Sequence, residues 1–577
     1  MTTQVGVIEP FGSWVSTTLS RRVATLARTM PHRPAVPIAS RLALGLILAV
    51  IASSPSAQTG VAAATETAES SQGARFDVLE FEVDGNTVLP VEAVERAITP
   101  YLGLGKAFAD VEAARAALEK TYQDAGYVTV FVDLPEQEVS QGVVRLRVLE
   151  GQISRLKVTE AKYHDPGLIR DRVSELAPGK VPNFNVAQAQ LADLNRTEDR
   201  RVQPILSPGP VPGTVEAELK VSDKLPLSFT VELNNRQVQF TDPLRLQVMG
   251  RYGNLFQEDH TLSFIGIVTP QDPKQSKAFG LNYLIPLPEG SSWQASLLVS
   301  DSSVQPLGGT NVVGKGFNVA LKRTWGLPAG QGFYHGLTIG LEYKNTRERI
   351  NAGADGSTLS SPLRYAPLVV DYSATWVRGE QVSTLTAGGT FAQRRVARRN
   401  VECFGQEDQF GCKREEGDGS FAAFRVDATH THPLPAGLSA RWRLGAQFAN
   451  QPLVGAEQFS VGGFDTVRGY YEAEILGDSG SHLGLEVSGP NWGGGSDGSW
   501  RGAFTELQAY GFAEAGRIST QNASDGSPTQ VAGAGLGLRL RMPSSLAASV
   551  DVAWPLKTTT ATQKGHPRVH ARLIHEF

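Results

Sequence analysis

The chain has 577 residues, with 60 glycines, 33 prolines and a formal net charge of -4 at pH 7. This length exceeds that of one ordinary domain, and the content of glycine and proline indicates many short elements joined by turns. The slightly acidic balance argues against a nucleic-acid-binding protein, which would show a basic excess.

Residues 1–57 carry the features of an export signal. Two arginines precede the apolar run Leu42–Ala52, which is too short to cross a bilayer but has the length of a signal-peptide core. Two alternatives stay open: the signal is extended, or translation starts at Met30. Residues 58–75, rich in Ala, Thr and Ser, are predicted to form a linker. No later run reaches the roughly 18 apolar residues of a membrane helix, which excludes a helical membrane protein.

Residues 76–152 and 153–223 are predicted to form two small α/β modules. In the first module, Val78–Val83 alternates as a strand, and two helices follow, the second with Asp110 as its N-cap. Two further strands complete a β-α-α-β-β order. The second module repeats this order in a weaker form.

Residues 225–577 are predicted to form a transmembrane antiparallel β-barrel of about 16 strands. In Leu438–Phe448 and Ala532–Leu540, apolar side chains alternate with polar or small ones, so that one face meets lipid and the other lines a polar lumen. The last strand ends at the aromatic residue Phe577, as bacterial outer-membrane barrels typically do. The even strand count agrees with a closed barrel.

The lengths of the connections predict the orientation of the barrel. Long connections follow odd strands, whereas several even strands are followed by short turns such as Arg378-Gly379. Because external loops are long and periplasmic turns are short, the odd-to-even connections are predicted to lie outside. The long connections are residues 301–312, 347–363, 395–417, 450–479 and 517–528.

The sixth of the external loops, residues 450–479, is rich in glycine and aromatic residues. It contains the sequence Val467-Arg468-Gly469-Tyr470. Its aromatic side chains are costly to leave in water, so we expect the loop to fold back onto the rest of the protein. Arg468 then needs a buried acidic partner.

The two modules, the barrel and this loop together resemble the outer-membrane transporters of two-partner secretion. Phe81-x-Val-x-Gly-Asn and Tyr122-x-x-x-Gly-Tyr look like a polypeptide-transport-associated (POTRA) module. In that family the sixth loop folds into the barrel, and its arginine pairs with an acidic residue on the thirteenth strand. The matching residues here are Phe512, Glu514 and Gly516, with Glu514 in place of the usual aspartate. The strand alternation independently points Glu514 into the lumen.

The resemblance implies a translocation pore and not an enzyme, with no cofactor. Transport is expected to run without ATP, because the sequence has no nucleotide-binding motif and the periplasm is expected to lack ATP. The implied partners are a secreted exoprotein, which docks unfolded by strand addition on the modules, the outer-membrane lipids and the barrel assembly machinery, but no nucleic acid. The implied location is the outer membrane of a Gram-negative bacterium, with the modules in the periplasm. No plug helix is expected ahead of the first module. The alternatives are an insertase of the same superfamily, which usually has more modules, and a passive porin or adhesin.

Several smaller features of the sequence are candidate sites. Cys403 and Cys412 lie close together in a polar loop, where they form a local disulfide or stay two free thiols. His430 and His432 share a strand face, but without a third ligand an interfacial position is favoured over a metal site. The fragment Gly477–Gly480 is similar to a serine-protease nucleophile turn, but no histidine has a matching context. The sequence therefore predicts no catalytic site and no metal site.

Overall fold

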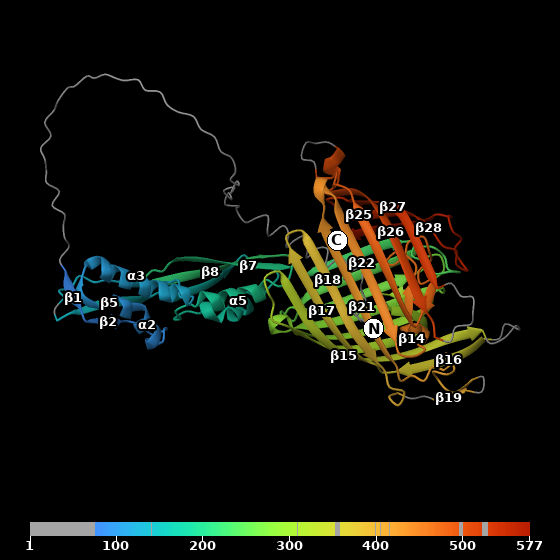
Figure 1. Cartoon of the computed structure of the whole chain (residues 1–577), viewed down its shortest axis with the longest axis horizontal. Coiled ribbons are helices and arrows are strands. Elements are labelled where there is room, and N and C mark those ends of the chain that lie inside the picture. The colour runs from blue at the N-terminus through green and yellow to red at the C-terminus, as the bar shows by residue number, and fades with distance from the viewer. Residues whose placement is uncertain are drawn as a thin grey trace, which may run out of the picture.

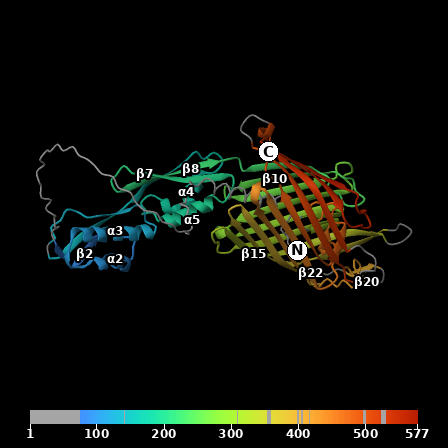
Figure 2. The ribbon, with the colours of Figure 1, turned by 45° about the horizontal axis from the view of Figure 1, so that its top comes forward.

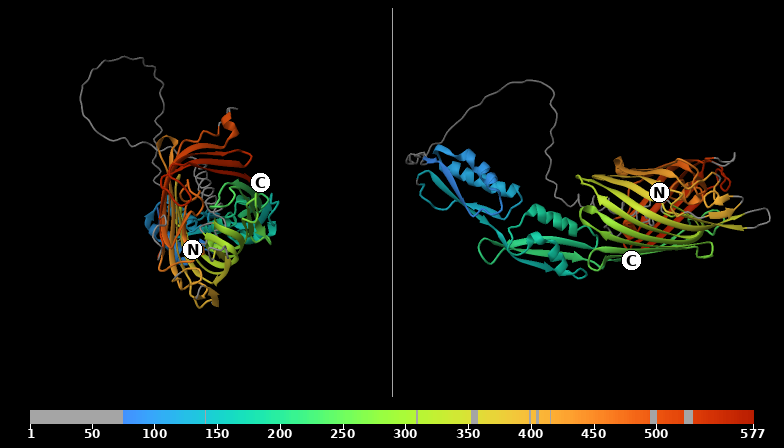
Figure 3. Two further views of the ribbon diagram at one scale, coloured as in Figure 1. Left: turned by 90° about the vertical axis from the view of Figure 1, so that its right-hand side faces the viewer. Right: turned by 90° about the horizontal axis from the view of Figure 1, so that it is seen from below.

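The computed structural model describes residues 75–577 except 140, 308–309, 352–357, 398–399, 404–405, 415, 495–499 and 522–528. Two small α/β modules lie in line along the long axis of the molecule, and a β-barrel follows at one end (Figure 1). The same order is visible after rotation about the horizontal axis (Figure 2 and the right panel of Figure 3). The predicted signal peptide, the linker through residue 74 and the question of a plug helix fall outside the described residues.

The first module packs two helices on one face of a three-stranded sheet. The sheet has the order β2-β5-β4, with β2 parallel to β5 and β4 antiparallel to it. Its apolar core includes Leu118, Tyr122, Val130 and Leu146. The elements are β1 (Phe76–Val78), β2 (Glu80–Asp84), α2 (Val91–Ile98), η2 (Thr99–Tyr101), β3 (Gly103–Lys106), α3 (Phe108–Asp124), β4 (Val130–Asp133) and β5 (Val143–Glu150).

The predicted N-cap of the second helix is wrong by three residues. The N-cap of α3 is Ala107, and Asp110 is the third helical residue. Its carboxylate accepts a hydrogen bond from the backbone N–H of Ala107 at 2.8 Å. Asp110 therefore still satisfies a backbone donor at the helix start, but it acts from inside the first turn.

The second module repeats the arrangement with the sheet order β6-β8-β7. Two hydrogen bonds tie it to the first module: the N–H of Phe184 donates to the carbonyl of Gly126 at 2.8 Å, and the side chain of Asn183 donates to the carbonyl of Ala125 at 3.0 Å. The elements are β6 (Gln152–Thr159), α4 (Pro166–Arg172), η3 (Ser174–Leu176), α5 (Phe184–Leu194), β7 (Arg200–Pro208) and β8 (Thr214–Asp223).

Most of the remaining strands close into an antiparallel barrel, in which the last strand pairs with the first. β19 (Asn400–Cys403) pairs with β20 (Gln406–Asp408) outside the barrel. β16 and β17 both pair with β15 and form one interrupted strand, so the predicted 16-strand barrel is confirmed. The strands are β9 (Leu227–Asn234), β10 (Arg245–Leu255), β11 (His260–Val268), β12 (Ser276–Pro286), β13 (Ser292–Leu307), β14 (Thr310–Gly326), β15 (Phe333–Asn351), β16 (Thr358–Tyr365), β17 (Leu368–Arg378), β18 (Gln381–Phe391), β21 (Ala422–Pro433), β22 (Ser439–Ala449), β25 (Ser479–Ser488), β26 (Glu506–Ser519), β27 (Gln530–Arg541), β28 (Leu546–Pro555) and β29 (Arg568–Glu576).

The side chains of the barrel strands alternate between the lumen and the outer surface. Lys322 and Glu342 are buried and form an ion pair of 3.1 Å inside the barrel. Their sequence neighbours Leu321 and Leu341 face outward and are exposed. An apolar outer face and a charged interior are what a strand-built membrane protein requires. In the described part of the chain, no helix is long and apolar enough to cross a membrane.

Two of the predicted external loops are wrong in extent. β13 and β14 stay paired up to Leu307 and Thr310, so most of the predicted loop 301–312 is strand. β15 and β16 likewise pair up to Asn351 and Thr358, within the predicted loop 347–363. The polar residues of these segments suggested loops. A strand that rises above the membrane meets water on both faces, so a polar sequence is compatible with continued pairing.

Ion pairs join the second module to the periplasmic side of the barrel. Asp259, in the turn between β10 and β11, accepts from Arg200 at 3.0 Å and also pairs with Arg172. Arg196 donates to the carbonyl of Leu287, in the turn between β12 and β13, at 2.8 Å. The first two even-to-odd turns of the barrel therefore rest against the second module.

Candidate functional site

The connection from β22 to β25, residues 450–478, is the sixth odd-to-even connection of the barrel. It contains η6 (Gly455–Glu457) and a short hairpin of β23 (Phe459–Val461) and β24 (Ile475–Gly477). The segment between these two strands carries Arg468 at its centre. We call residues 450–478 the sixth loop.

An apolar cluster holds the sixth loop against the barrel wall. Val467 and Tyr470 are fully buried in it. The cluster brings loop residues together with two residues of β26 and β27, and comprises Phe459, Val461, Val467, Tyr470, Ile475, Ile518 and Val531. Burial of this aromatic and aliphatic surface gives the loop a reason to fold inward, as expected from its composition.

Arg468 lies against Glu514 of β26, the thirteenth strand of the barrel. The guanidinium donates to the Glu514 carboxylate from Nε at 3.0 Å and from a terminal nitrogen at 2.6 Å. The backbone N–H of Arg468 donates to the other carboxylate oxygen at 2.7 Å. The side chains of Arg468 and Glu514 are 3% and 0% exposed, so the pair is shielded from water. The longer glutamate side chain therefore reaches the arginine.

Further charges surround this pair. Arg468 also meets Glu486 at 3.2 Å and Asp551 at 3.5 Å. Arg443 pairs with Glu514, and Arg539 pairs with Glu486 at 3.0 Å. These contacts join three arginines and three carboxylates. Balanced charge of this kind offsets the cost of burying each ion.

The ring of Phe512 packs against the Arg468 side chain. The Arg468 guanidinium lies 3.4 Å from the centroid of the Phe512 ring, which is a cation–π contact. Gly516, the other residue of the sequence pattern, lies beside the apolar cluster, where an added Cβ would meet Val461 and Val467. Phe512, Glu514 and Gly516 thus face the sixth loop from one strand.

Gly469 and Tyr470 fix the backbone next to Arg468. Gly469 has a φ of +97°, which favours glycine, and its N–H donates to Nε2 of His570 at 2.9 Å. The Tyr470 hydroxyl lies 2.9 Å from the carbonyl oxygen of Ala532 and 2.8 Å from that of Lys557. The four residues Val467 to Tyr470 therefore all contact the barrel.

The base of the sixth loop reaches a distant part of the wall. Glu457 accepts from Lys344 of β15 at 2.8 Å and from the Tyr365 hydroxyl at 2.5 Å. Because β15 is the seventh strand and β26 the thirteenth, the loop crosses the barrel interior between them. Sequence reasoning missed Glu457, although an acidic residue at the start of an aromatic loop was a usable signal.

A further ion pair attaches the loop to the first external connection. Asp465 pairs with Arg236 at 2.5 and 2.9 Å, and the Arg236 guanidinium lies 4.8 Å from the Phe464 ring centroid. Arg236 is the second residue after the end of β9. Neither residue was predicted, because no sequence pattern links positions so far apart in the chain.

The other predicted residues lie away from the sixth loop. Cys412 is disulfide-bonded, and the side chain of Cys403 falls outside the described residues. His430 and His432 have ring centroids 5.8 Å apart, and no metal-binding group of three ligands occurs among the described residues. Phe577 packs beside Phe229 of the first strand, with ring centroids 6.0 Å apart.

Comparisons with known proteins agree with this geometry. The model of the family described as haemolysin secretion/activation protein ShlB/FhaC/HecB matches residues 213–540, which is more than half of the chain. The chain belongs to this family. A second model, the POTRA domain of ShlB type, matches residues 76–151. The predicted family resemblance is therefore confirmed.

Relatives from this family cover most of the chain. The outer membrane transporter CdiB of Escherichia coli O6:K15:H31 is 23% identical over 457 residues, covering 75% of this chain and 72% of that protein. The CdiB protein of Dickeya dadantii is 21% identical over 510 residues, covering 84% of each. The chain is thus an outer-membrane transporter of the two-partner secretion type, with its POTRA modules in the periplasm.

Solved structures share the fold. CdiB from Escherichia coli superposes with a TM-score of 0.60 at 21% identity, covering 89% of this chain and 93% of that one. CdiB from Acinetobacter baumannii gives 0.55 at 14% identity over the whole of both chains. BamA from Haemophilus ducreyi lacking POTRA domains 1–3 gives 0.52 at 13% identity, covering 87% of this chain and 100% of that one. The family is one of transporters and secretion proteins, and it is not a known enzyme family.

Proposed function

We propose that this transporter captures an unfolded exoprotein in the periplasm and passes it through the barrel without ATP. The docked sixth loop carries the proposal, because it crosses the lumen and is held there by a shielded ion pair between Arg468 and Glu514. A loop in this position lines any route through the barrel. We infer that Arg468 and Glu514 anchor the loop in its active position.

The exposed edge of β2 is the proposed docking strand for the exoprotein. β4, at the other edge of the first sheet, is partly covered by side chains of α3. The N–H of Val132 donates to Glu119 at 3.2 Å, and Arg115 donates to the carbonyl of Val132 at 3.1 Å. β2 pairs with β5 on one side, and among the described residues no strand pairs on the other. An extended client segment adds to such an edge through its backbone.

A crosslinking experiment tests the capture step. A photoreactive residue is placed at Glu80 or Glu82, both exposed on β2, and at exposed Lys120 on α3 as the control. The probe is the secreted exoprotein to be sought in the neighbouring open reading frame, expressed with its own signal. We expect adducts from β2 and none from Lys120. Equal adducts from both elements would refute docking at this edge.

Reconstitution tests the transport step. The full chain is placed in liposomes, and the denatured exoprotein is added on the module side without nucleotide. We expect protease-protected exoprotein inside the vesicles that carry the wild-type chain. A strict requirement for ATP would refute transport without ATP. Equal entry of an unrelated unfolded protein would refute specific capture and favour a passive pore.

A further inference from the structure

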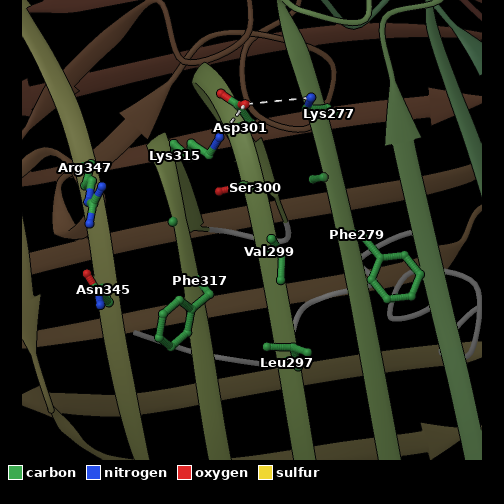
Figure 4. A pocket seen from close by; sticks show the side chains of 12 residues that line it. Lys277, Phe279, Leu297, Val299, Ser300, Asp301, Lys315, Phe317, Asn345 and Arg347 are labelled. Atoms are coloured by element: carbon green, nitrogen blue, oxygen red, sulfur yellow. Dashed lines mark ion pairs between the residues drawn. The ribbon is translucent and has the colours of Figure 1, made fainter.

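A row of charged residues crosses the outer surface of four neighbouring strands near their external ends. The strand register places Lys277, Asp301, Lys315 and Arg347 side by side on β12, β13, β14 and β15. Two residues toward the membrane, the next row is Phe279, Val299, Phe317 and Asn345. In Figure 4 the charged side chains lie in the upper part of the view, and the rings of Phe279 and Phe317 lie below them.

Both rows face the membrane and not the lumen. On the same strands, the alternate residues Lys322, Glu342 and Lys344 are buried inside the barrel. Phe279, Val299 and Phe317 have exposed fractions of 46%, 45% and 37%. Because the register runs without interruption through these positions, the charged row shares the outward face with the apolar row.

The charged row lies at the outer boundary of the apolar band. On β14 the outward face is apolar at Phe317, Val319 and Leu321. Toward the periplasm it continues with Arg323, whose guanidinium lies over the rings of Trp293 and Trp325, and it ends with Trp325. Eight residues separate Phe317 from Trp325, which is roughly 26 Å along the strand and roughly 20 Å across the membrane at a typical barrel tilt. Lys315 therefore comes at the depth where the headgroups of the outer leaflet begin.

The row carries a positive excess. Asp301 lies 3.8 Å from Lys277 and 3.7 Å from Lys315, which are long contacts between exposed side chains. Such pairs contribute little, about 0–1 kcal/mol. Three cations against one carboxylate leave two positive charges for an outside anion, and long basic side chains at a membrane boundary extend to reach phosphates.

A hollow lies directly beneath these charges. It has a volume of about 610 Å³, and its apolar lining includes Phe279, Leu297, Val299 and Phe317. The hollow thus joins a cationic rim to an apolar floor that belongs to the lipid-facing band. This combination matches a molecule with a phosphate group and hydrocarbon chains.

We propose that the hollow binds one phosphorylated glycolipid of the outer leaflet, of the lipid A type. Lys277, Lys315 and Arg347 contact its phosphate, and an acyl chain lies along Phe279 and Phe317. The bound lipid holds the long neighbouring strands β13, β14 and β15 at a fixed depth in the membrane. The site is separate from the sixth loop, so it does not depend on the proposed export route.

Lipid binding to the purified full chain in a non-ionic detergent tests the proposal. The probe is diphosphorylated hexa-acyl lipid A, and native mass spectrometry measures the bound fraction. We expect the combined variant Lys277→Gln, Lys315→Gln and Arg347→Gln to bind at least about tenfold more weakly. Asp301→Asn removes the competing carboxylate, so we expect it to bind as well as the wild type or more tightly.

The control variants separate this site from general charge effects. Lys120→Gln, Lys157→Gln and Lys162→Gln together remove the same charge from exposed positions of the modules, and we expect no change. Heat-modifiable migration in gels checks that each barrel is folded. Equal lipid A binding by the wild type and the first triple variant would overturn the proposal.

Other probes identify the class of ligand. Lipid A without phosphates is expected to bind several-fold more weakly to the wild type, because the cationic rim loses its partner. Inorganic phosphate alone is expected not to compete, since it has no chain for the apolar floor. Competition by phosphate, or equal affinity for phosphatidylglycerol, would overturn the assignment to a lipid A type molecule.

Discussion

Glu514 accepts hydrogen bonds from both the backbone and the side chain of Arg468. One carboxylate oxygen binds the N–H at 2.7 Å, and the other binds the guanidinium at 2.6 and 3.0 Å. The carboxylate therefore fixes the position of the loop backbone as well as that of the charge. Substitutions at the two residues are expected to differ in effect for this reason.

Arg468→Ala is expected to release the sixth loop while the barrel still inserts. Breaking a shielded pair costs roughly 3–5 kcal/mol, because Glu514 stays buried with fewer partners. We expect secretion of the exoprotein to fall by at least tenfold, measured in culture medium. The control is Arg378→Ala, at an exposed periplasmic turn. Normal secretion by Arg468→Ala would contradict the anchoring role.

The combined variant Arg468→Met and Glu514→Gln is expected to cost less than the sum of its single changes. Each single change leaves the six-residue network unbalanced, with three charges of one sign against two of the other. The double change restores the balance at two of each. The measurement is a double-mutant cycle on loop protection from external protease. Additive effects would show that the two residues act independently.

Gly533→Ala is expected to displace the sixth loop without altering any charge. A Cβ at Gly533 of β27 would collide with the carbonyl oxygen of Arg468, which is backbone and cannot turn away. The control is Gly511→Ala on β26, where a Cβ would make only ordinary contacts at 3.5 Å or more. We expect increased protease cleavage of the loop in the first variant alone. Unchanged protection would mean that the loop is not closely packed at this point.

The sequence predicted the fold best where apolar and polar side chains alternate with a period of two residues. Alternation along Leu438–Phe448 predicted the barrel, because its two faces meet different solvents. The prediction that Glu514 is the acidic partner of Arg468 rests on the family pattern, and the strand alternation supports it by pointing Glu514 into the lumen. The pairing of Asp465 with Arg236 joins residues more than 200 positions apart, and local patterns carry no information about such a contact.

The joint between the second module and the barrel is expected to loosen only in acid. Burial opposes ionisation of Asp259, but the hydrogen bonds and charges of Arg200 and Arg172 outweigh it and lower its pKa below the usual 3.8. A depressed carboxyl pKa gives stability that is present above 3.8 and lost as the pH falls through the folded value. Asp259→Asn removes this contribution at every pH, by roughly 3 kcal/mol, since two cations lose their partner.

Distances between spin labels on α5 and on the external end of β11 measure this joint. We expect one narrow distribution for the wild type at pH 7, which broadens only below about pH 4. Asp259→Asn is expected to give the broad distribution already at pH 7. Glu258→Gln is the matched control, because the side chain of this neighbouring residue is 62% exposed. Among the described residues its one ion pair is with His260, at 3.4 Å. A narrow distribution for Asp259→Asn would show that other contacts, such as that of Arg196 with Leu287, hold the module in place.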